Sequence, residues 1–158
     1  MLNRCKKSMA DSIVLLQYDF RNRLPFQSEQ FDFVLSTANS VISGIEKPEK
    51  ILKEVKRVLK NEGRLVIDTY NAENLTEDII EKYYKKLPKK IRFKKFDKKK
   101  KIIYLNGLYS RWLTENELKN LIEKAGFKLV SIQKKGIGLI AIAKKEWLYG
   151  KRKIRIVC

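Results

Sequence analysis

The chain has 158 residues, of which 44% are hydrophobic, so it can bury a core and is too apolar to stay unfolded. It has no histidine, and its two cysteines, Cys5 and Cys158, lie far apart in the sequence. This composition excludes Ser-His-Asp and Cys-His catalysis and argues against a zinc site. The net charge of +18 has two interpretations: polyanionic partners, or a lysine-rich composition of the kind common in heat-adapted proteins.

The sequence shows no membrane or export signal. No apolar run approaches the roughly 18 residues that span a bilayer, and residues 1–7 lack the apolar segment of a signal peptide. We therefore expect a cytoplasmic protein of one domain that makes no contact with a membrane.

The first 70 residues predict strands and helices in alternation. Residues 1–10 suit the end of an amphipathic helix, and Pro48 suits the first turn of another helix, whose apolar side chains recur at helical spacing. We expect Gly63 to end that helix as a left-handed cap. The expected strands are Ile13–Leu16, Phe31–Ser36 and Arg64–Thr69.

The middle of the chain predicts a helix and a hairpin. Thr76 can cap a helix over about residues 77–87, and Pro88 ends it. Residues 91–96 and 101–108 have the pattern of two strands joined by a short polar turn.

The last part of the chain predicts one helix and two strands. Thr114 and Glu117 have the spacing of a capping box, and the helix behind it ends at Gly126. Two strands follow, Phe127–Gln133 and Ile137–Ala143. The alternation before residue 70 indicates an α/β fold with a mostly parallel sheet, and the closing strand pair adds an antiparallel edge strand.

Five motifs stand in an order and spacing typical of one enzyme family. They are Tyr18-Asp19-Phe20 with Leu24-Pro25-Phe26, Phe31-Asp32-Phe33-Val34, Arg57–Ile67, Trp112-Leu113-Thr114 with Glu117-Leu118, and Ala125-Gly126-Phe127. Over about residues 1–143 they resemble the class I S-adenosylmethionine-dependent methyltransferases of the type 11-like group. The resemblance implies an incomplete Rossmann-like sheet with helices on both faces. It also implies a basic helix-hairpin insertion at about residues 72–110 and a basic extension over residues 144–158.

The resemblance implies S-adenosyl-L-methionine as the cofactor and places four residues beside it. In the family, a residue at the position of Asp19 accepts a hydrogen bond from the adenine amino group, and Phe20 would offer its backbone N–H and its ring to the adenine. Ser36 and Thr37 would line the methionine part of the cofactor through backbone groups, since ligands of open α/β sheets lie beyond the carboxyl ends of the strands. Taken without the motif, Asp19 suits a turn at the end of a strand.

Four further residues are expected to face the methyl acceptor. Tyr70 and Asn71 come just after the Arg64–Thr69 strand, and Tyr109 and Arg111 precede the last helix. Each also suits an ordinary surface or boundary position. No catalytic residue is identified, since alignment of the acceptor with the activated methyl group supplies most of the rate, and no metal is expected.

The strand, glycine-rich turn and helix that open the family fold have no counterpart, because the first glycine is Gly44. We therefore expect the resemblance to begin inside the helix that follows the second family strand. The missing strands would leave the Phe31–Ser36 strand with an open edge. We expect either the Ile13–Leu16 strand to pair there or a partner chain to cover it, and the chain alone to bind the cofactor weakly or not at all.

Residues 82–101 hold eleven Lys, one Arg and one Asp, which is most of the excess positive charge. This Lys82–Lys101 block lies where the family places substrate-recognition insertions. It predicts an RNA or tRNA acceptor, with stacking by Tyr83, Tyr84, Phe93 and Phe96; the alternatives are a solvated surface and a small-molecule acceptor.

Two functions follow from the sequence. The first is an S-adenosylmethionine-dependent methyltransferase, or the C-terminal part of one. The second is a non-catalytic methyltransferase fold that binds RNA or a partner subunit. A helix-turn-helix DNA-binding protein is a poor match, because strands separate the helices.

Overall fold

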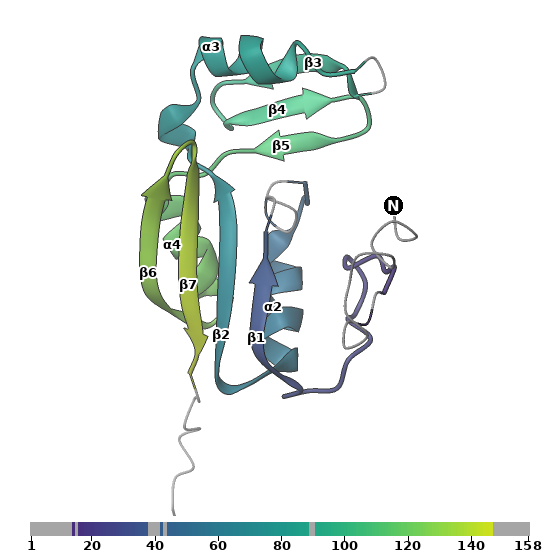
Figure 1. The fold of residues 1–158 in the computed structure, drawn as a ribbon, viewed down its shortest axis with the longest axis vertical. Helices are drawn as coiled ribbons and strands as arrows, with labels where there is room; N and C mark the ends of the chain where they lie inside the picture. The colour runs from purple at the N-terminus through teal and green to yellow at the C-terminus, as the bar shows by residue number, and fades with distance from the viewer. Residues whose placement is uncertain (1–13, 15, 38–41, 43, 89–90, 147–158) are drawn as a thin grey trace, which may run out of the picture.

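The protein is described by a computed structural model at residue 14 and residues 16–37, 42, 44–88 and 91–146, which form two sheets (Figure 1). A four-stranded sheet makes up the larger body, and a three-stranded sheet lies beyond its upper end. The helix expected over residues 1–10 and the stretch from residue 147 onward lie outside the described residues. Val14 and Leu16, from the strand expected at Ile13–Leu16, are exposed and belong to no strand.

The larger sheet has the strand order β1-β2-β7-β6. These strands are β1 (Phe31–Ser36), β2 (Leu59–Tyr70), β6 (Phe127–Lys135) and β7 (Gly138–Lys145). β1 and β2 are parallel, and β7 is antiparallel to both of its neighbours, so β6 runs in the same direction as β1 and β2. The predicted α/β class with a mostly parallel sheet is confirmed.

The antiparallel strand lies inside this sheet and not at its edge as predicted. The short turn after β6 folds β7 back into the place beside β2, which leaves β6 at the edge. The burial of β7 explains the arrangement, because Leu139, Ala141 and Ala143 are fully buried in the core.

Two helices cover one face of the larger sheet. α2 (Pro48–Val58) and α4 (Glu115–Lys124) contact each other and share one hydrophobic core with β2 and β7. The sequence predicts helices on both faces, whereas both of these helices lie on the same one. On the opposite face, Phe33 and Leu35 of β1 are 64% and 68% exposed.

The turn between α2 and β2 differs from the prediction at Gly63. α2 ends at Val58, and β2 begins with the next residue. The positive φ angle of 67° belongs to Glu62, whereas a Cβ added to Gly63 would lie 3.2 Å from the carbonyl oxygen of Asp32. A glycine at position 63 therefore allows two backbones to approach closely and does not form a left-handed cap.

The predicted ends of α4 are confirmed. Thr114 Oγ1 accepts a hydrogen bond from the Glu117 N–H at 3.2 Å, and the Glu117 carboxylate accepts one from the Thr114 N–H at 2.8 Å. This reciprocal pair is a complete capping box. Gly126, with a φ angle of 85°, follows the helix.

Between β2 and α4 the chain forms the smaller, antiparallel sheet, made of β3 (Phe93–Asp97), β4 (Ile102–Leu105) and β5 (Tyr109–Arg111). The predicted hairpin is confirmed as β3 and β4. β5 was not predicted, because three residues are too few to show an alternating pattern.

A short helical segment precedes this sheet. It consists of η1 (Ala72–Asn74), α3 (Glu77–Ile79) and the π-helical turn η2 (Ile80–Tyr84). Thr76 caps α3 as predicted, since its Oγ1 accepts a hydrogen bond from the Ile79 N–H at 3.3 Å. The helix ends at Tyr84, earlier than the predicted residue 87. Within the described part of the chain, every helix is too short or too polar to cross a membrane.

A second apolar cluster joins this helical segment to the smaller sheet. Trp112 Nε1 donates a hydrogen bond to Tyr84 Oη at 3.0 Å, and Tyr84 Oη is also 3.0 Å from Ser110 Oγ. All three side chains are buried, so the network satisfies polar atoms that have left water.

Substitution of Tyr84 by Phe is expected to destabilise the protein by about 1–3 kcal/mol. The change removes the hydroxyl that Trp112 and Ser110 share and leaves both of their polar atoms buried without this partner. Urea unfolding measures the free energy, and Tyr83→Phe is the matched control because Tyr83 is 48% exposed. Equal stability of the two variants would contradict the network.

Candidate functional site

The parallel pairing of β1 and β2 brings their carboxyl ends together below the smaller sheet (Figure 1). The register places Leu35 beside Val66 and Ser36 beside Ile67. In sheets of this kind, ligands bind beyond the carboxyl ends of the strands. A ligand-binding site is therefore expected next to Ser36 and Tyr70.

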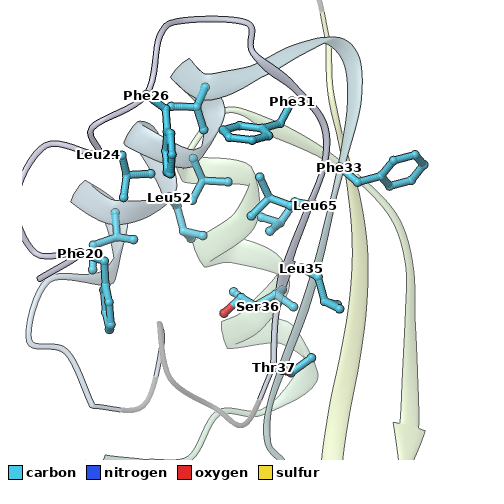
Figure 2. A pocket seen from close by; sticks show the side chains of 15 residues that line it. Phe20, Leu24, Phe26, Phe31, Phe33, Leu35, Ser36, Thr37, Leu52 and Leu65 are labelled. Carbon is cyan, nitrogen blue, oxygen red and sulfur yellow. The ribbon is translucent and has the colours of Figure 1, made fainter. Parts of the chain in front are cut away.

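A cavity of about 480 Å³ lies along β1, between that strand and α2. This volume is within the range of small-molecule sites. Figure 2 shows its aromatic and aliphatic wall, with Phe20, Leu24, Phe26 and Phe31 around it, while Phe33 points away on the other side of β1.

Three of the four predicted cofactor residues line this cavity: Phe20, Ser36 and Thr37. Among its described lining residues, Ser36 and Thr37 are the polar ones. Ser36 Oγ is buried and has no hydrogen-bond partner within the described part of the chain. Because an unpaired buried hydroxyl is costly, a ligand that supplies a partner would be stabilised there.

Asp19, the fourth predicted cofactor residue, does not line the cavity. Its carboxylate binds the Arg21 side chain at 2.6–3.1 Å and accepts a hydrogen bond from the Arg21 backbone N–H at 3.0 Å. These hydrogen bonds lower the pKa of Asp19 to about 2, so the group is an anion at neutral pH. Its partners are those of the turn that its sequence context also suggests.

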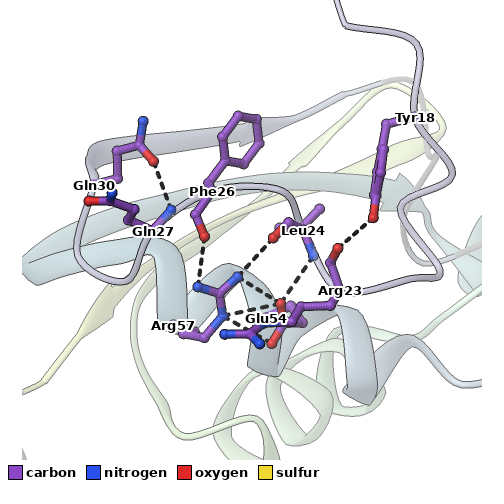
Figure 3. A network of polar contacts seen from close by, with 8 residues as sticks. All are labelled: Tyr18, Arg23, Leu24, Phe26, Gln27, Gln30, Glu54 and Arg57. Atoms are coloured by element: carbon purple, nitrogen blue, oxygen red, sulfur yellow. Dashed lines mark hydrogen bonds and ion pairs between the residues drawn. The ribbon is translucent and has the colours of Figure 1, made fainter.

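The cavity wall at Leu24-Pro25-Phe26 is held by two charged side chains of α2 (Figure 3). Arg57 donates to the carbonyl oxygens of Phe26 at 2.8 Å and Leu24 at 3.0 Å, and it pairs with Glu54 at 2.9 Å. Glu54 in turn accepts a hydrogen bond from the Leu24 N–H at 3.1 Å. We call these two residues the Glu54–Arg57 clamp. An acid and a base three residues apart on one helix predict the Glu54–Arg57 ion pair. Nothing in the local sequence predicts that the pair binds the loop at Leu24–Phe26.

The acceptor residues predicted at the end of β2 have structural contacts. The Tyr70 ring stacks on Trp112, with centres 4.6 Å apart, and lines a separate aromatic cavity of about 230 Å³. Asn71 is 1% exposed, and its Oδ1 accepts a hydrogen bond from the Glu73 N–H at 3.1 Å. Asn71 thus caps η1.

The acceptor residues predicted on β5 lie near the start of α2. Tyr109 lines a third cavity, of about 430 Å³, together with Glu46, Lys47 and Lys50. Its hydroxyl is buried without a partner among the described residues, and burial raises its pKa. Arg111 reaches the carbonyl oxygen of Glu46 at 3.5 Å. Tyr70 and Tyr109 therefore line different cavities, and Trp112, the residue after Arg111, is the one that stacks on Tyr70.

Comparisons with known proteins agree with this architecture. Residues 1–67 match the model of a methyltransferase domain family. A demethylmenaquinone methyltransferase of Lactobacillus johnsonii is 31% identical over 75% of this chain and 48% of its own length. An uncharacterised protein of Methanocaldococcus jannaschii is 30% identical over 66% of this chain and 42% of its own. The chain thus spans less than half the length of these curated relatives.

A solved structure shares the fold. A chain from the complex between the Haloferax volcanii Trm112 methyltransferase activator and a methyltransferase superposes with a TM-score of 0.64 at 16% identity, over 92% of this chain and 66% of that one. The fold is therefore that of the class I methyltransferases. In sequence over residues 1–67 and in fold, the chain is thus similar to the class I S-adenosylmethionine-dependent methyltransferases.

The Glu54–Arg57 clamp has an expected pH dependence. The hydrogen bonds from Arg57 lower the pKa of Glu54 below its ordinary value of 4.5, so the clamp stabilises the fold above that pH. Glu54→Gln is expected to cost about 1–2 kcal/mol at neutral pH. The cost should shrink as the pH falls through the lowered pKa, because the carboxylate is then protonated in the folded protein too.

Urea unfolding of both proteins between neutral pH and pH 3 would measure this difference. Glu123→Gln, at an exposed carboxylate of α4, is the control. A cost for Glu54→Gln that stays constant over this range would rule out a charge-dependent clamp.

Proposed function

We propose that this chain carries part of an S-adenosylmethionine-dependent methyltransferase site, at the carboxyl ends of β1 and β2. The observation that carries the proposal is the cavity beside β1, which combines an aromatic wall with the buried Ser36 hydroxyl, unpaired among the described residues. The solved complex of a Burkholderia thailandensis methyltransferase with S-adenosylhomocysteine supports the choice of cofactor for this fold.

The cavity suits one end of the cofactor better than the other. Phe20 and Phe26 offer apolar surfaces for the flat adenine ring. Ser36 Oγ, which has no partner among the described residues, offers a hydrogen bond at the strand end. The described lining is otherwise apolar, so partners for the ribose hydroxyls and the carboxylate must come from elsewhere.

Bound S-adenosylmethionine would supply a methyl group already activated by its sulfonium. The protein's task is then to hold an acceptor in line with that methyl group and to exclude water. We assign this task to the carboxyl ends of β1 and β2, at Ser36 and Tyr70, and to the smaller sheet that lies beyond them. This explains how a chain without histidine can serve in such an enzyme.

The edge of β1 that faces away from β2 is a candidate surface for binding a further strand. Among the described residues β1 pairs with β2 alone, and Phe33 and Leu35 stay exposed on the sheet face that α2 does not cover. An apolar strand edge of this kind favours pairing with another strand. We propose that a further segment or a partner chain completes the sheet here; the activator complex described above shows that one protein of this fold does bind a second chain.

A second candidate is a non-catalytic methyltransferase fold that binds RNA or a partner subunit. Its support is the same apolar lining, which offers little to the polar end of the cofactor, together with the positive charge of the smaller sheet. Methyl transfer from labelled cofactor would exclude it.

The Ser36→Ala variant shows whether the Ser36 hydroxyl binds the ligand or stabilises the fold. Removal of an unpaired buried hydroxyl is expected to leave the free energy of unfolding unchanged or raise it. If the hydroxyl binds the cofactor, the dissociation constant for S-adenosylhomocysteine should rise about threefold to tenfold.

Ser110→Ala is the matched control, because Ser110 Oγ is bonded to Tyr84. It should lower stability and leave cofactor binding unchanged. Urea unfolding and ligand titration by nuclear magnetic resonance measure the two quantities. The assignment of Ser36 fails if Ser36→Ala behaves as Ser110→Ala does.

A further inference from the structure

One face of the smaller sheet carries two cations and two aromatic rings. Lys95 is paired with Tyr104 across β3 and β4, and Tyr104 with Tyr109 across β4 and β5, so these three side chains share a face. Arg111, two residues after Tyr109, belongs to the same face. Lys95 Nζ lies 4.9 Å from the centre of the Tyr104 ring, and the Arg111 guanidinium carbon lies 6.0 Å from that of Tyr109. We call this the Lys95–Arg111 face.

The other face of the sheet is used by the fold. Ile103 is fully buried in the second apolar cluster, and Phe93 and Phe96 pack against it. Tyr84 is also buried there. The stacking role predicted for Tyr84 is therefore wrong, because its ring is buried, whereas Phe93 and Phe96 are half-buried and pack against the same cluster.

Positive charge gathers at the end of the same sheet. Residues 91–101 contain seven cationic side chains and one carboxylate. Lys98, Lys99 and Lys100 form the exposed turn between β3 and β4. Close spacing of like charges is unfavourable unless an anion offsets it, and phosphates are the usual partner of such clusters.

The Lys95–Arg111 face also leads toward the candidate methyl-transfer site. The third cavity, of about 430 Å³, lies between Tyr109 and the first turn of α2, where Lys47 and Lys50 add positive charge. Ile51 lines both this cavity and the one beside β1. A chain of nucleotides on the face would thus end next to the proposed site.

We propose that the Lys95–Arg111 face and the Lys98–Lys100 turn bind single-stranded nucleic acid. Tyr104 and Tyr109 stack on bases, and the lysines contact phosphates. RNA and DNA share this chemistry. A role of the bound strand as methyl acceptor rests on the proposed function, whereas the binding itself does not require the cofactor.

Binding is tested on the full chain, without cofactor, by fluorescence anisotropy of a labelled oligouridine of about 15 nucleotides. We expect saturable binding that weakens with salt. Lys98→Gln/Lys99→Gln/Lys100→Gln should weaken it roughly tenfold or more. Lys53→Gln/Lys119→Gln/Lys124→Gln, which removes the same charge from exposed positions of α2 and α4, should change it much less.

Tyr104→Leu tests stacking and should weaken binding about fivefold or more, with Tyr83→Leu, outside this face, as the control. Circular dichroism confirms that each variant is folded. Oligothymidine of equal length distinguishes DNA from RNA, and binding of either supports the proposal. Equal effects of the two lysine triples, an inert Tyr104→Leu, or equal competition by inorganic polyphosphate would overturn it in favour of a general polyanion surface. Because no cofactor is present, such a failure leaves the proposed methyl transfer untouched.

Discussion

The parallel pairing of β1 with β2 is the constraint on which the rest of the structure depends. Parallel strands need a crossover connection, and α2 supplies it, packing on the sheet through Ile51, Leu52 and Val55. The same pairing sets both carboxyl ends at one edge of the sheet. This arrangement forms the cavity between β1 and α2 and sets Ser36 at its end.

Among the described residues β1 pairs with β2 alone. A strand with one ladder partner exposes unpaired backbone groups and, here, two large apolar side chains, Phe33 and Leu35. The Glu54–Arg57 clamp holds the loop at Leu24–Phe26 against α2 and so fixes the wall of the cavity that this loop forms. The described lining is mostly apolar, which is why we propose that it takes the adenine end of a methyl donor.

Much of the fold could be predicted from local signals. The Thr114–Glu117 capping box, the Thr76 cap and the strand at Phe31–Ser36 depend on neighbours in the sequence, and each is confirmed. The errors concern partners that are distant in sequence. Gly63 meets the backbone of Asp32, β7 inserts beside β2, and Tyr84 finds Trp112, and none of these contacts has a local pattern.

The candidate site shows the same division. Phe20, Ser36 and Thr37 were predicted from the family motifs and line one cavity, whereas the tertiary clamp of Glu54 and Arg57 on the loop before β1 was not foreseen.

Titration of the isotope-labelled chain with S-adenosylhomocysteine, followed by nuclear magnetic resonance, tests the central claim most directly. The account predicts shifts concentrated at these three residues, with a dissociation constant of about 1 mM or weaker, since the described lining of the cavity offers few polar partners to the ligand. Micromolar affinity, or shifts confined to the smaller sheet, would contradict it.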